Sequence, residues 1–115
     1  KVLMFAVIAK DRDTHIGNVK LDLDERNKRA TFGIMIGNKD YWNKGYGTET
    51  TKLTIKYCIN SLNYRRIELT VNSHNKSAIK IYKNLGFKEE GVFHRALLFK
   101  GNFVDEYFMT YRNYE

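Results

Sequence analysis

A glycine-bearing segment in the first half of the chain has the composition of an anion-binding turn. It runs from Tyr41 to Glu49 with the sequence YWNKGYGTE, between an apolar run over 30–37 and a helical pattern over 48–60. The first backbone N–H groups of a helix have no intrahelical partner and carry partial positive charge. Glycines let a phosphate come close to the backbone. The segment therefore predicts a site for a phosphate-bearing ligand.

Two common phosphate-binding patterns are excluded for this segment. A Walker A loop requires G-x-x-x-x-G-K-[ST], and no stretch of the chain matches it. A dinucleotide fingerprint requires a third glycine three residues after Gly47, and that position is Thr50. A different class of phosphate-bearing ligand is therefore expected.

Periodicity predicts an α/β (α+β) fold with the element order β-β-β-α-β-α-β-β. The expected strands cover 2–9, 16–23, 30–37, 66–71, 87–99 and 103–111, and the expected helices cover 48–60 and 76–85. Helices between strands require at least one parallel crossover in a mostly antiparallel sheet. The run over 2–9 is apolar throughout, which is typical of a strand buried on both faces.

Individual residues refine these elements. Gly33 lies inside an expected strand, which predicts a bulge or a close approach by another backbone. Asn75 is suited to cap the second helix and Gly86 to end it. Residues 100–102 (KGN) predict a tight hairpin. The apolar side of the first helix is expected to consist of Leu53, Ile55, Cys58, Ile59 and Leu62.

Composition limits the class of protein. The 115 residues suffice for one domain over 1–115, and 20 basic against 13 acidic residues give a net charge of +7. That charge suits a nucleic acid, a membrane surface or a polyphosphate ligand, or it serves solubility alone. No apolar run approaches the ~20 residues of a membrane helix. The single cysteine, Cys58, is expected to be a buried thiol and fits a reducing, cytoplasmic setting. The three histidines lack metal-ligand spacing, so no metal is expected.

Two segments resemble the GNAT acetyltransferase superfamily. The stretch Trp42–Gly47 is similar to the family's acyl-CoA loop, [QR]-x-x-G-x-[GA], with Trp42 where Gln or Arg is usual. The stretch Asn75–Phe87 looks like the family's N-x-x-A-[IL]-x-x-Y-x-x-x-G-F segment. The resemblance leans toward the ribosomal-protein-alanine type, and spermidine acetyltransferases look similar as well. Family members usually carry a strand and two helices ahead of this region, which the chain is expected to lack.

The resemblance implies acetyl transfer from acetyl-CoA, as co-substrate, to a primary amine. A protein N-terminus is the first expectation, and a small amine (spermidine, an aminoglycoside or an amino sugar) is the alternative. Asn75 would hydrogen-bond the pantetheine arm, and Tyr82 would protonate the CoA thiolate, although spacing alone favours a core tyrosine. The residues expected to bind acetyl-CoA are Ile34, Met35, Ile36, Trp42, Asn43, Lys44, Gly45, Tyr46, Gly47, Thr48, Asn75, Ala78 and Tyr82.

Several roles stay open at this level. Glu68 lies on the polar side of an alternating strand and is a candidate base for the amine, or else an ion-pair partner of a nearby Arg or Lys. A basic nucleic-acid-binding module is a hypothesis from another class, although the aromatic residues alternate inside strands, where core contacts explain them. A catalytically inactive family member is a third. The hairpin over 87–111 could also lend an edge to a second copy in a homodimer.

Overall fold

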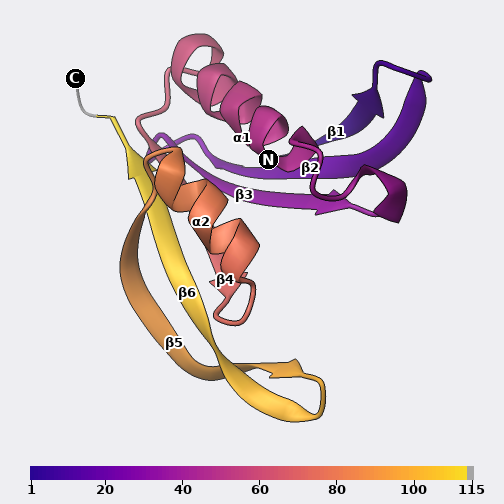
Figure 1. Cartoon of the computed structure of the whole chain (residues 1–115). Helices are drawn as coiled ribbons and strands as arrows, with labels where there is room; N and C mark the ends of the chain where they lie inside the picture. Colours follow the sequence, from indigo (N-terminus) through magenta and orange to yellow (C-terminus); the bar gives the residue numbers. More distant parts are fainter. Residues whose placement is uncertain (114–115) are drawn as a thin grey trace.

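The computed structural model describes residues 1–113, which form one six-stranded sheet with two α-helices (Figure 1). The order of elements is the predicted one. The elements are β1 (Val2–Ala9), β2 (Thr14–Asp24), β3 (Arg29–Ile36), α1 (Tyr46–Lys56), β4 (Arg66–Asn72), α2 (Lys76–Asn84), β5 (Lys88–Phe99) and β6 (Asn102–Arg112). A short 3₁₀ helix (Lys39–Tyr41) precedes α1, and a π-helical turn (Tyr57–Ser61) follows it.

The sheet is mixed and mostly antiparallel, as predicted. Its strand order is β1-β2-β3-β4-β6-β5. Among the described residues only the β3–β4 pair is parallel, and α1 forms the crossover between these two strands. The β5–β6 hairpin closes over Lys100 and Gly101, which both have positive φ, and this agrees with the expected tight turn.

Both helices cover the same face of the sheet. Along the ladders the buried residues Leu21, Phe32, Ile67 and Met109 follow one another on one face. The π-helical turn after α1 contacts this face near β1, where the Phe5 and Tyr57 rings lie 5.5 Å apart. α2 lies against β4 and β6 (Figure 1). We call the opposite side the open face, because no helix within residues 1–113 covers it.

The two middle strands, β3 and β4, diverge along their length. β3 pairs with β4 at only three positions, where residues 29–31 meet residues 66–68. Beyond Thr31 the rest of β3 and the rest of β4 are no longer hydrogen-bonded neighbours. We call this opening, between 32–36 of β3 and 69–72 of β4, the fork.

The prediction that the first strand is buried on both faces is wrong. β1 is an edge strand, and Met4 and Ile8 are 61% and 44% exposed. Only Val7 and Ala9 are buried in it. An apolar run shows that a strand can be buried, but the strand order decides whether neighbours exist to bury it.

The apolar side of the first helix also differs from the prediction. Leu53 is 59% exposed, whereas Thr51 and Thr54 are buried with Ile55. The Thr51 hydroxyl donates to the Gly47 carbonyl at 2.7 Å, and the Thr54 hydroxyl donates to the Thr50 carbonyl at 2.9 Å. Because each hydroxyl finds a partner one turn back, threonine can be buried here without an unsatisfied polar group.

The close backbone approach predicted at Gly33 occurs at another glycine. Among the described residues, none would lie within 4 Å of a Cβ atom on Gly33, and the β2–β3 register is regular there. A Cβ atom on Gly17 would lie 2.1 Å from the Met35 carbonyl oxygen. The β1–β2 register shifts beside Gly17, so the irregularity lies on β2.

No helix in the described part of the chain combines the length and the apolar character that a membrane span needs.

Candidate functional site

The turn before α1 has the backbone shape of an anion site. Asn43 and Gly45 adopt left-handed conformations, with φ of 60° and 86°. Gly45 is the N-cap of α1, and the first α1 bond runs from the Glu49 N–H to the Gly45 carbonyl at 3.0 Å. The N–H groups of residues 46–48 therefore have no acceptor inside the helix. Such a turn at a helix N-terminus attracts an anion.

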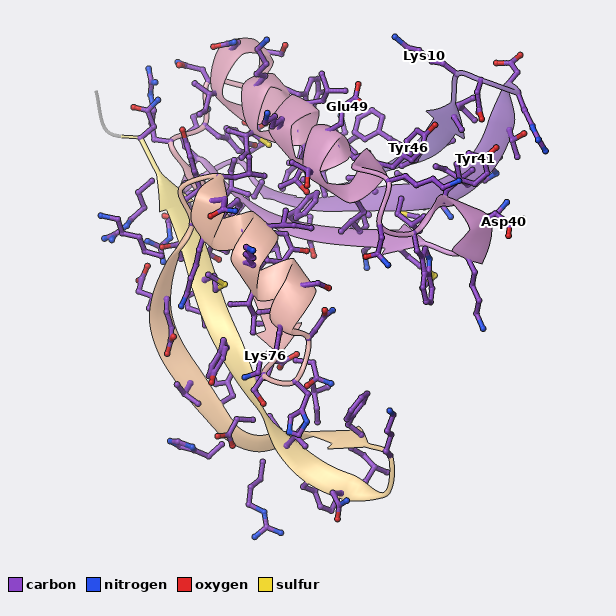
Figure 2. The ribbon with its side chains drawn as sticks, viewed as in Figure 1. Lys10, Asp40, Tyr41, Tyr46, Glu49 and Lys76 are labelled. Carbon is purple, nitrogen blue, oxygen red and sulfur yellow. The ribbon has the colours of Figure 1, made fainter. Side chains whose placement is uncertain are left out.

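Aromatic residues fix this turn to the body of the protein. The ring of Tyr41 is buried and meets Tyr46 edge to face at 5.3 Å (Figure 2). The indole Nε1–H of Trp42 donates to the Ile36 carbonyl at 2.6 Å. The Lys39 ammonium group lies 5.9 Å from the centre of the Trp42 ring. The irregular first position of the motif therefore ties the turn to the last residue of β3.

The register of β3 shows which backbone groups face the fork. The Gly37 N–H donates to the Ile16 carbonyl on β2 at 2.9 Å. Bonded and non-bonded positions alternate along an antiparallel ladder, so Ile36 and Ile34 direct their N–H and carbonyl groups toward the β4 side. Met35 directs its groups toward β2. Of the three predicted backbone contacts, only Ile34 and Ile36 can reach a ligand in the fork.

α2 begins with the predicted cap and carries Tyr82 on its sheet-facing side. The Asn75 side-chain oxygen accepts from the Ala78 N–H at 3.2 Å. Tyr82 is half-buried, and its ring lies 5.6 Å from the Phe87 ring. Burial raises the pKa of the Tyr82 hydroxyl above its ordinary value. A phenol in this setting keeps its proton through the neutral range.

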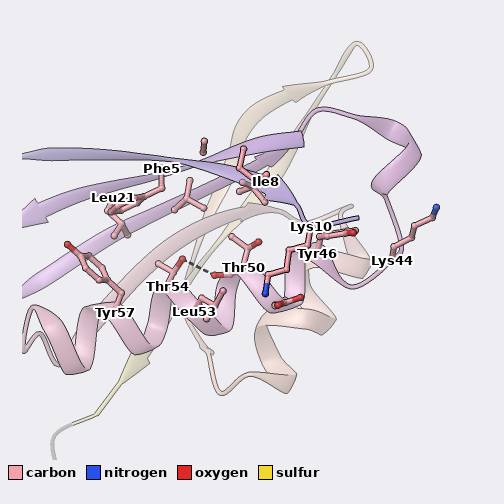
Figure 3. A pocket seen from close by; sticks show the side chains of 14 residues that line it. Phe5, Ile8, Lys10, Leu21, Lys44, Tyr46, Thr50, Leu53, Thr54 and Tyr57 are labelled. Carbon is pink, nitrogen blue, oxygen red and sulfur yellow. Dashed lines mark hydrogen bonds between the residues drawn. The ribbon is translucent and has the colours of Figure 1, made fainter. Parts of the chain in front are cut away.

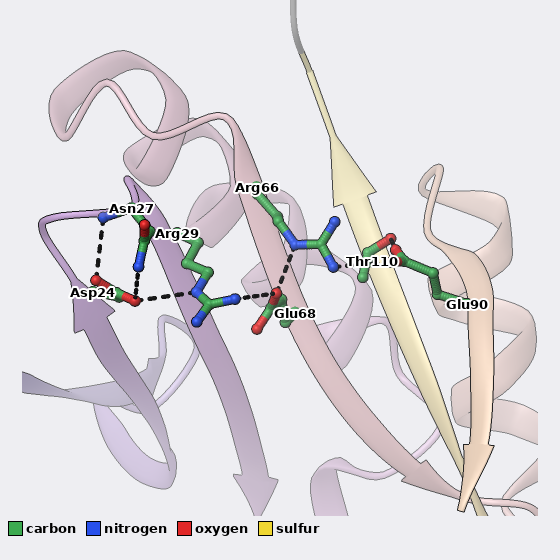
Figure 4. A network of polar contacts seen from close by, with 7 residues as sticks. All are labelled: Asp24, Asn27, Arg29, Arg66, Glu68, Glu90 and Thr110. Atoms are coloured by element: carbon green, nitrogen blue, oxygen red, sulfur yellow. Dashed lines mark hydrogen bonds and ion pairs between the residues drawn. The ribbon is translucent and has the colours of Figure 1, made fainter.

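Glu68 lies in a chain of ion pairs on the open face (Figure 4). Its Oε2 atom accepts from Arg66 Nε at 2.6 Å and lies 3.6 Å from Arg29 Nη1. Arg66 Nη2 also contacts Glu90 at 3.0 Å, and the Thr110 hydroxyl donates to Glu90 at 2.5 Å. Glu68 is only 8% exposed. The ion-pair alternative left open by the sequence is therefore present in the structure.

This chain of ion pairs marks the closed end of the fork. Thr31 and Glu68 are the last register pair of β3 and β4. Because successive side chains of a strand point to opposite faces, Glu68 and Tyr82 lie on opposite sides of the sheet. The structure thus brings the turn and the β3 edge together, and it separates the two predicted catalytic side chains.

A cavity of about 570 Å³ lies elsewhere, between α1 and strands β1 and β2 (Figure 3). Phe5, Val19 and Leu21 line it from the sheet, and Leu53 lines it from α1. Lys44 also lines it, so the cavity adjoins the turn. This cavity explains why Leu53 on α1 is exposed, since its side chain lines the cavity and is not packed in the core.

Sequence reasoning missed one part of the site. Ion pairing of Glu68 was one of the two roles left open, and alternation places Arg66 on the same side of the strand. The Trp42–Ile36 bond had no signal in the sequence, since no periodicity connects a loop side chain to a backbone carbonyl. Within residues 1–113 there is no group of three or more His, Cys, Asp or Glu side chains suited to a metal ion.

Comparison with known proteins gives one matching family. Residues 1–88 match the family described as Acetyltransferase (GNAT) domain. The chain is 34% identical to the uncharacterized N-acetyltransferase p20 of Bacillus licheniformis over 107 residues, which cover 92% of this chain and 60% of that protein. It is 37% identical to the L-amino acid N-acetyltransferase AaaT of Escherichia coli over 98 residues, which cover 83% of this chain and 60% of that protein.

A solved structure agrees with these matches. The dodecameric spermidine N-acetyltransferase of Vibrio cholerae superposes with a TM-score of 0.89 at 26% identity, covering 96% of this chain and 64% of that one. The chain thus spans about 60% of the length of the curated relatives that it matches.

Proposed function

The chain belongs to the GNAT acetyltransferase family, and on that basis we propose that it transfers an acetyl group from acetyl-CoA to a primary amine. The observation that carries this proposal is the turn at the start of α1. It offers outward N–H groups directly beside the diverging edge of β3. A pyrophosphate and an extended amide-bearing arm, joined in one molecule, would find complementary partners there.

Different residues of the chain would bind different parts of acetyl-CoA. The N–H groups over 43–48 would hold the pyrophosphate, with the Lys44 ammonium group adding positive charge. The backbone of Ile34 and the N–H of Ile36 would pair with the pantetheine amides as a neighbouring strand would. Asn75 and Ala78, at the start of α2, would line the far side of the arm. Acetyl-CoA supplies the activated acyl group, and these contacts orient it.

Tyr82 is proposed as the acid of the reaction. The amine nitrogen forms a bond to the acetyl carbon, the carbon–sulfur bond breaks, and the sulfur takes the hydroxyl proton of Tyr82. The raised pKa of Tyr82 keeps that proton in place before transfer. An outward N–H of the β3 edge would stabilise the negative charge that develops on the acetyl oxygen.

Glu68 is proposed as the acceptor of the amine proton, through a water molecule. Its Oε2 atom pairs with both guanidinium groups, so Oε1 is the atom available for this step. The rate should rise with pH as more of the amine arrives unprotonated. Glu68→Gln tests the role: an unchanged pH–rate profile would leave Glu68 as an ion-pair residue only.

The acceptor is proposed to be an α-amine, with a protein N-terminus first and a free amino acid second. The chain carries a net charge of +7, which repels a polycation. On the open face, the carboxylates of Glu68 and Glu90 already have guanidinium partners. One relative is named for L-amino acids and a structural neighbour for spermidine. A panel of peptides, amino acids and polyamines, read out by thiol release, ranks these classes.

Binding of acetyl-CoA is tested with variants of two glycines that have similar backbone conformations, Gly45 in the turn before α1 and Gly101 in the β5–β6 hairpin. Gly45 and Gly101 have φ of +86° and +82°, and in the part of the chain that the structure describes neither has a neighbour within 4 Å of an added Cβ. Replacing either with alanine should therefore cost similar stability, about 1–2 kcal/mol. We expect acetyl-CoA to raise the unfolding temperature of the wild type and of Gly101→Ala. Gly45→Ala should lose this shift.

The size of the shift follows from mass action. At a hundred times its dissociation constant a ligand stabilises by about 2.7 kcal/mol, which is roughly 10 °C for a domain of this size. The single tryptophan, Trp42, provides a second signal, because its emission should change when a ligand covers the turn. No shift at millimolar acetyl-CoA would refute the proposed function.

A further inference from the structure

The side chain of Trp42 bridges two parts of the chain that would contact different parts of acetyl-CoA. Its backbone belongs to the turn, where the Trp42 N–H donates to the Lys39 carbonyl at 3.1 Å. Its indole Nε1–H reaches the Ile36 carbonyl on β3 at 2.6 Å. The first part offers N–H groups to an anion, and the second offers a strand edge.

The Ile36 carbonyl is one of the groups directed toward the fork. The neighbouring Gly37 N–H points the other way, to Ile16 on β2. Within residues 1–113, a carbonyl at the open end of the fork has no strand partner, because β3–β4 pairing ends at Thr31. The indole therefore satisfies the last acceptor on this edge. A ligand arm lying along β3 would meet the groups of Ile34 before it reached the indole.

The other contacts of the turn hold its shape and do not reach this edge. The Asn38 side chain accepts from the Asp40 N–H at 3.1 Å, which is a contact within the turn. Tyr41 contacts Tyr46 on α1 and reaches Asp11 beyond β1 at 3.4 Å. Within residues 1–113, the Trp42 indole bond is the side-chain hydrogen bond that joins residues 38–46 to the β3 edge.

We propose that Trp42 is a positioning residue that fixes the distance between the phosphate-binding turn and the β3 edge, so that one donor molecule contacts both at once. This inference rests on the proposed function. A ligand that binds two subsites gains from the second only when their separation matches its own length. A turn that moved freely relative to β3 would lose that gain and keep each separate contact.

The experiment compares whole and partial ligands on Trp42→Phe. This substitution keeps an aromatic ring and removes the N–H donor. The whole ligand is acetyl-CoA. The partial ligand is adenosine 3′-phosphate 5′-diphosphate, which carries the phosphates and lacks the pantetheine arm. Calorimetry measures both, since the variant has no tryptophan to report binding. Lys39→Ala is the matched control, because it removes the cation near the ring and keeps the indole bond.

The expected result is a differential loss. Acetyl-CoA should bind Trp42→Phe on the order of three- to tenfold more weakly than the wild type, as the loss of one hydrogen bond implies. The partial ligand should stay within about twofold of its wild-type affinity. Lys39→Ala should leave the ratio of the two affinities unchanged.

Two results would overturn the inference. Equal weakening of both ligands would mean that Trp42 only shapes the turn, and no weakening of either would mean that the bond is idle. If Trp42→Phe does not fold, Trp42→His, which keeps a ring N–H, is measured with the same two ligands. Its affinity for acetyl-CoA should then lie between that of the wild type and a complete loss of binding. Failure of the wild type to bind acetyl-CoA would instead refute the proposed function itself, and this inference with it.

Discussion

Replacing Gly17 with alanine should destabilise the protein far more than the same change at Gly33. Both glycines lie inside strands of one ladder, β2 and β3. A Cβ atom on Gly17 would lie 2.1 Å from the Met35 carbonyl oxygen and 2.9 Å from the Ile36 Cα atom. On Gly33 it would lie in open space. The two variants thus differ in one physical respect, which is contact with neighbouring backbone.

The magnitude follows from that contact. Ordinary van der Waals separation begins near 3.4 Å, so the β3 backbone would have to move by more than an ångström. Overfilling a well-packed site costs about 1–3 kcal/mol, and a backbone atom cannot rotate away, so we expect the upper end. Alanine also lowers the conformational entropy of the unfolded chain, which offsets about 0.4–1 kcal/mol of this cost. The net effect of Gly17→Ala is a loss of about 2 kcal/mol.

Gly33→Ala should instead be neutral or stabilising. A strand-interior glycine is about 0.5–1 kcal/mol less favourable than alanine, and no clash offsets this gain. The two variants should therefore differ by about 3 kcal/mol in free energy of unfolding. Urea unfolding followed by far-ultraviolet circular dichroism measures this, with the midpoint shifted and the m value unchanged. Equal midpoints for the two variants would refute the close approach between β2 and β3.

Three further outcomes are expected. Tyr82→Phe should lower the turnover by about a hundredfold or more while acetyl-CoA affinity stays unchanged, and a normal turnover would remove Tyr82 from the reaction. Hydrogen bonds from the Thr110 hydroxyl and then from Arg66 lower the pKa of Glu90. The Glu90 carboxylate therefore stabilises the fold above the unfolded pKa of 4.5, and this stabilisation is lost as the pH falls through the folded pKa. Glu90→Gln should accordingly lower the urea midpoint at neutral pH and approach the wild type as the pH falls through the folded pKa of Glu90. Burial raises the pKa of Cys58 to about 11, so iodoacetamide should label this thiol only after unfolding, and rapid labelling of the folded protein would contradict its burial.

The sequence predicted what depends on local pattern. Strand and helix order followed from periodicity, and the Asn75 cap and the turn at Gly101 followed from residues with narrow conformational preferences. The location of the glycine turn beside the end of β3 followed in the same way. These features need no knowledge of which strands become neighbours.

Features that depend on neighbours could not be predicted. Val2–Ala9 has the composition of a central strand and lies at the edge, because the strand order comes from long-range pairing. Gly17 and Gly33 are indistinguishable in a single sequence, yet only the first faces a carbonyl. Glu68 meets Arg29 across the β3–β4 pair, and that contact joins residues 39 positions apart. A side-chain role set by such a contact becomes visible only in three dimensions.

The short parallel seam between β3 and β4 has a consequence for how the molecule assembles. On one side of it, β1, β2, β3 and α1 follow one another in the chain, and on the other side so do β4, α2, β5 and β6. Each of these two groups of elements, which we call lobes, can form from contacts that are near in sequence and therefore form fastest. Pairing of β3 with β4 has to close a longer loop of chain. Native-state hydrogen exchange should therefore show two protected units, with the amide of Ala30, which alternation along β3 directs toward β4, among the first to open. The place where the two lobes join is also where the fork begins, so the proposed donor site would be the last part of the protein to be built and the first to be lost.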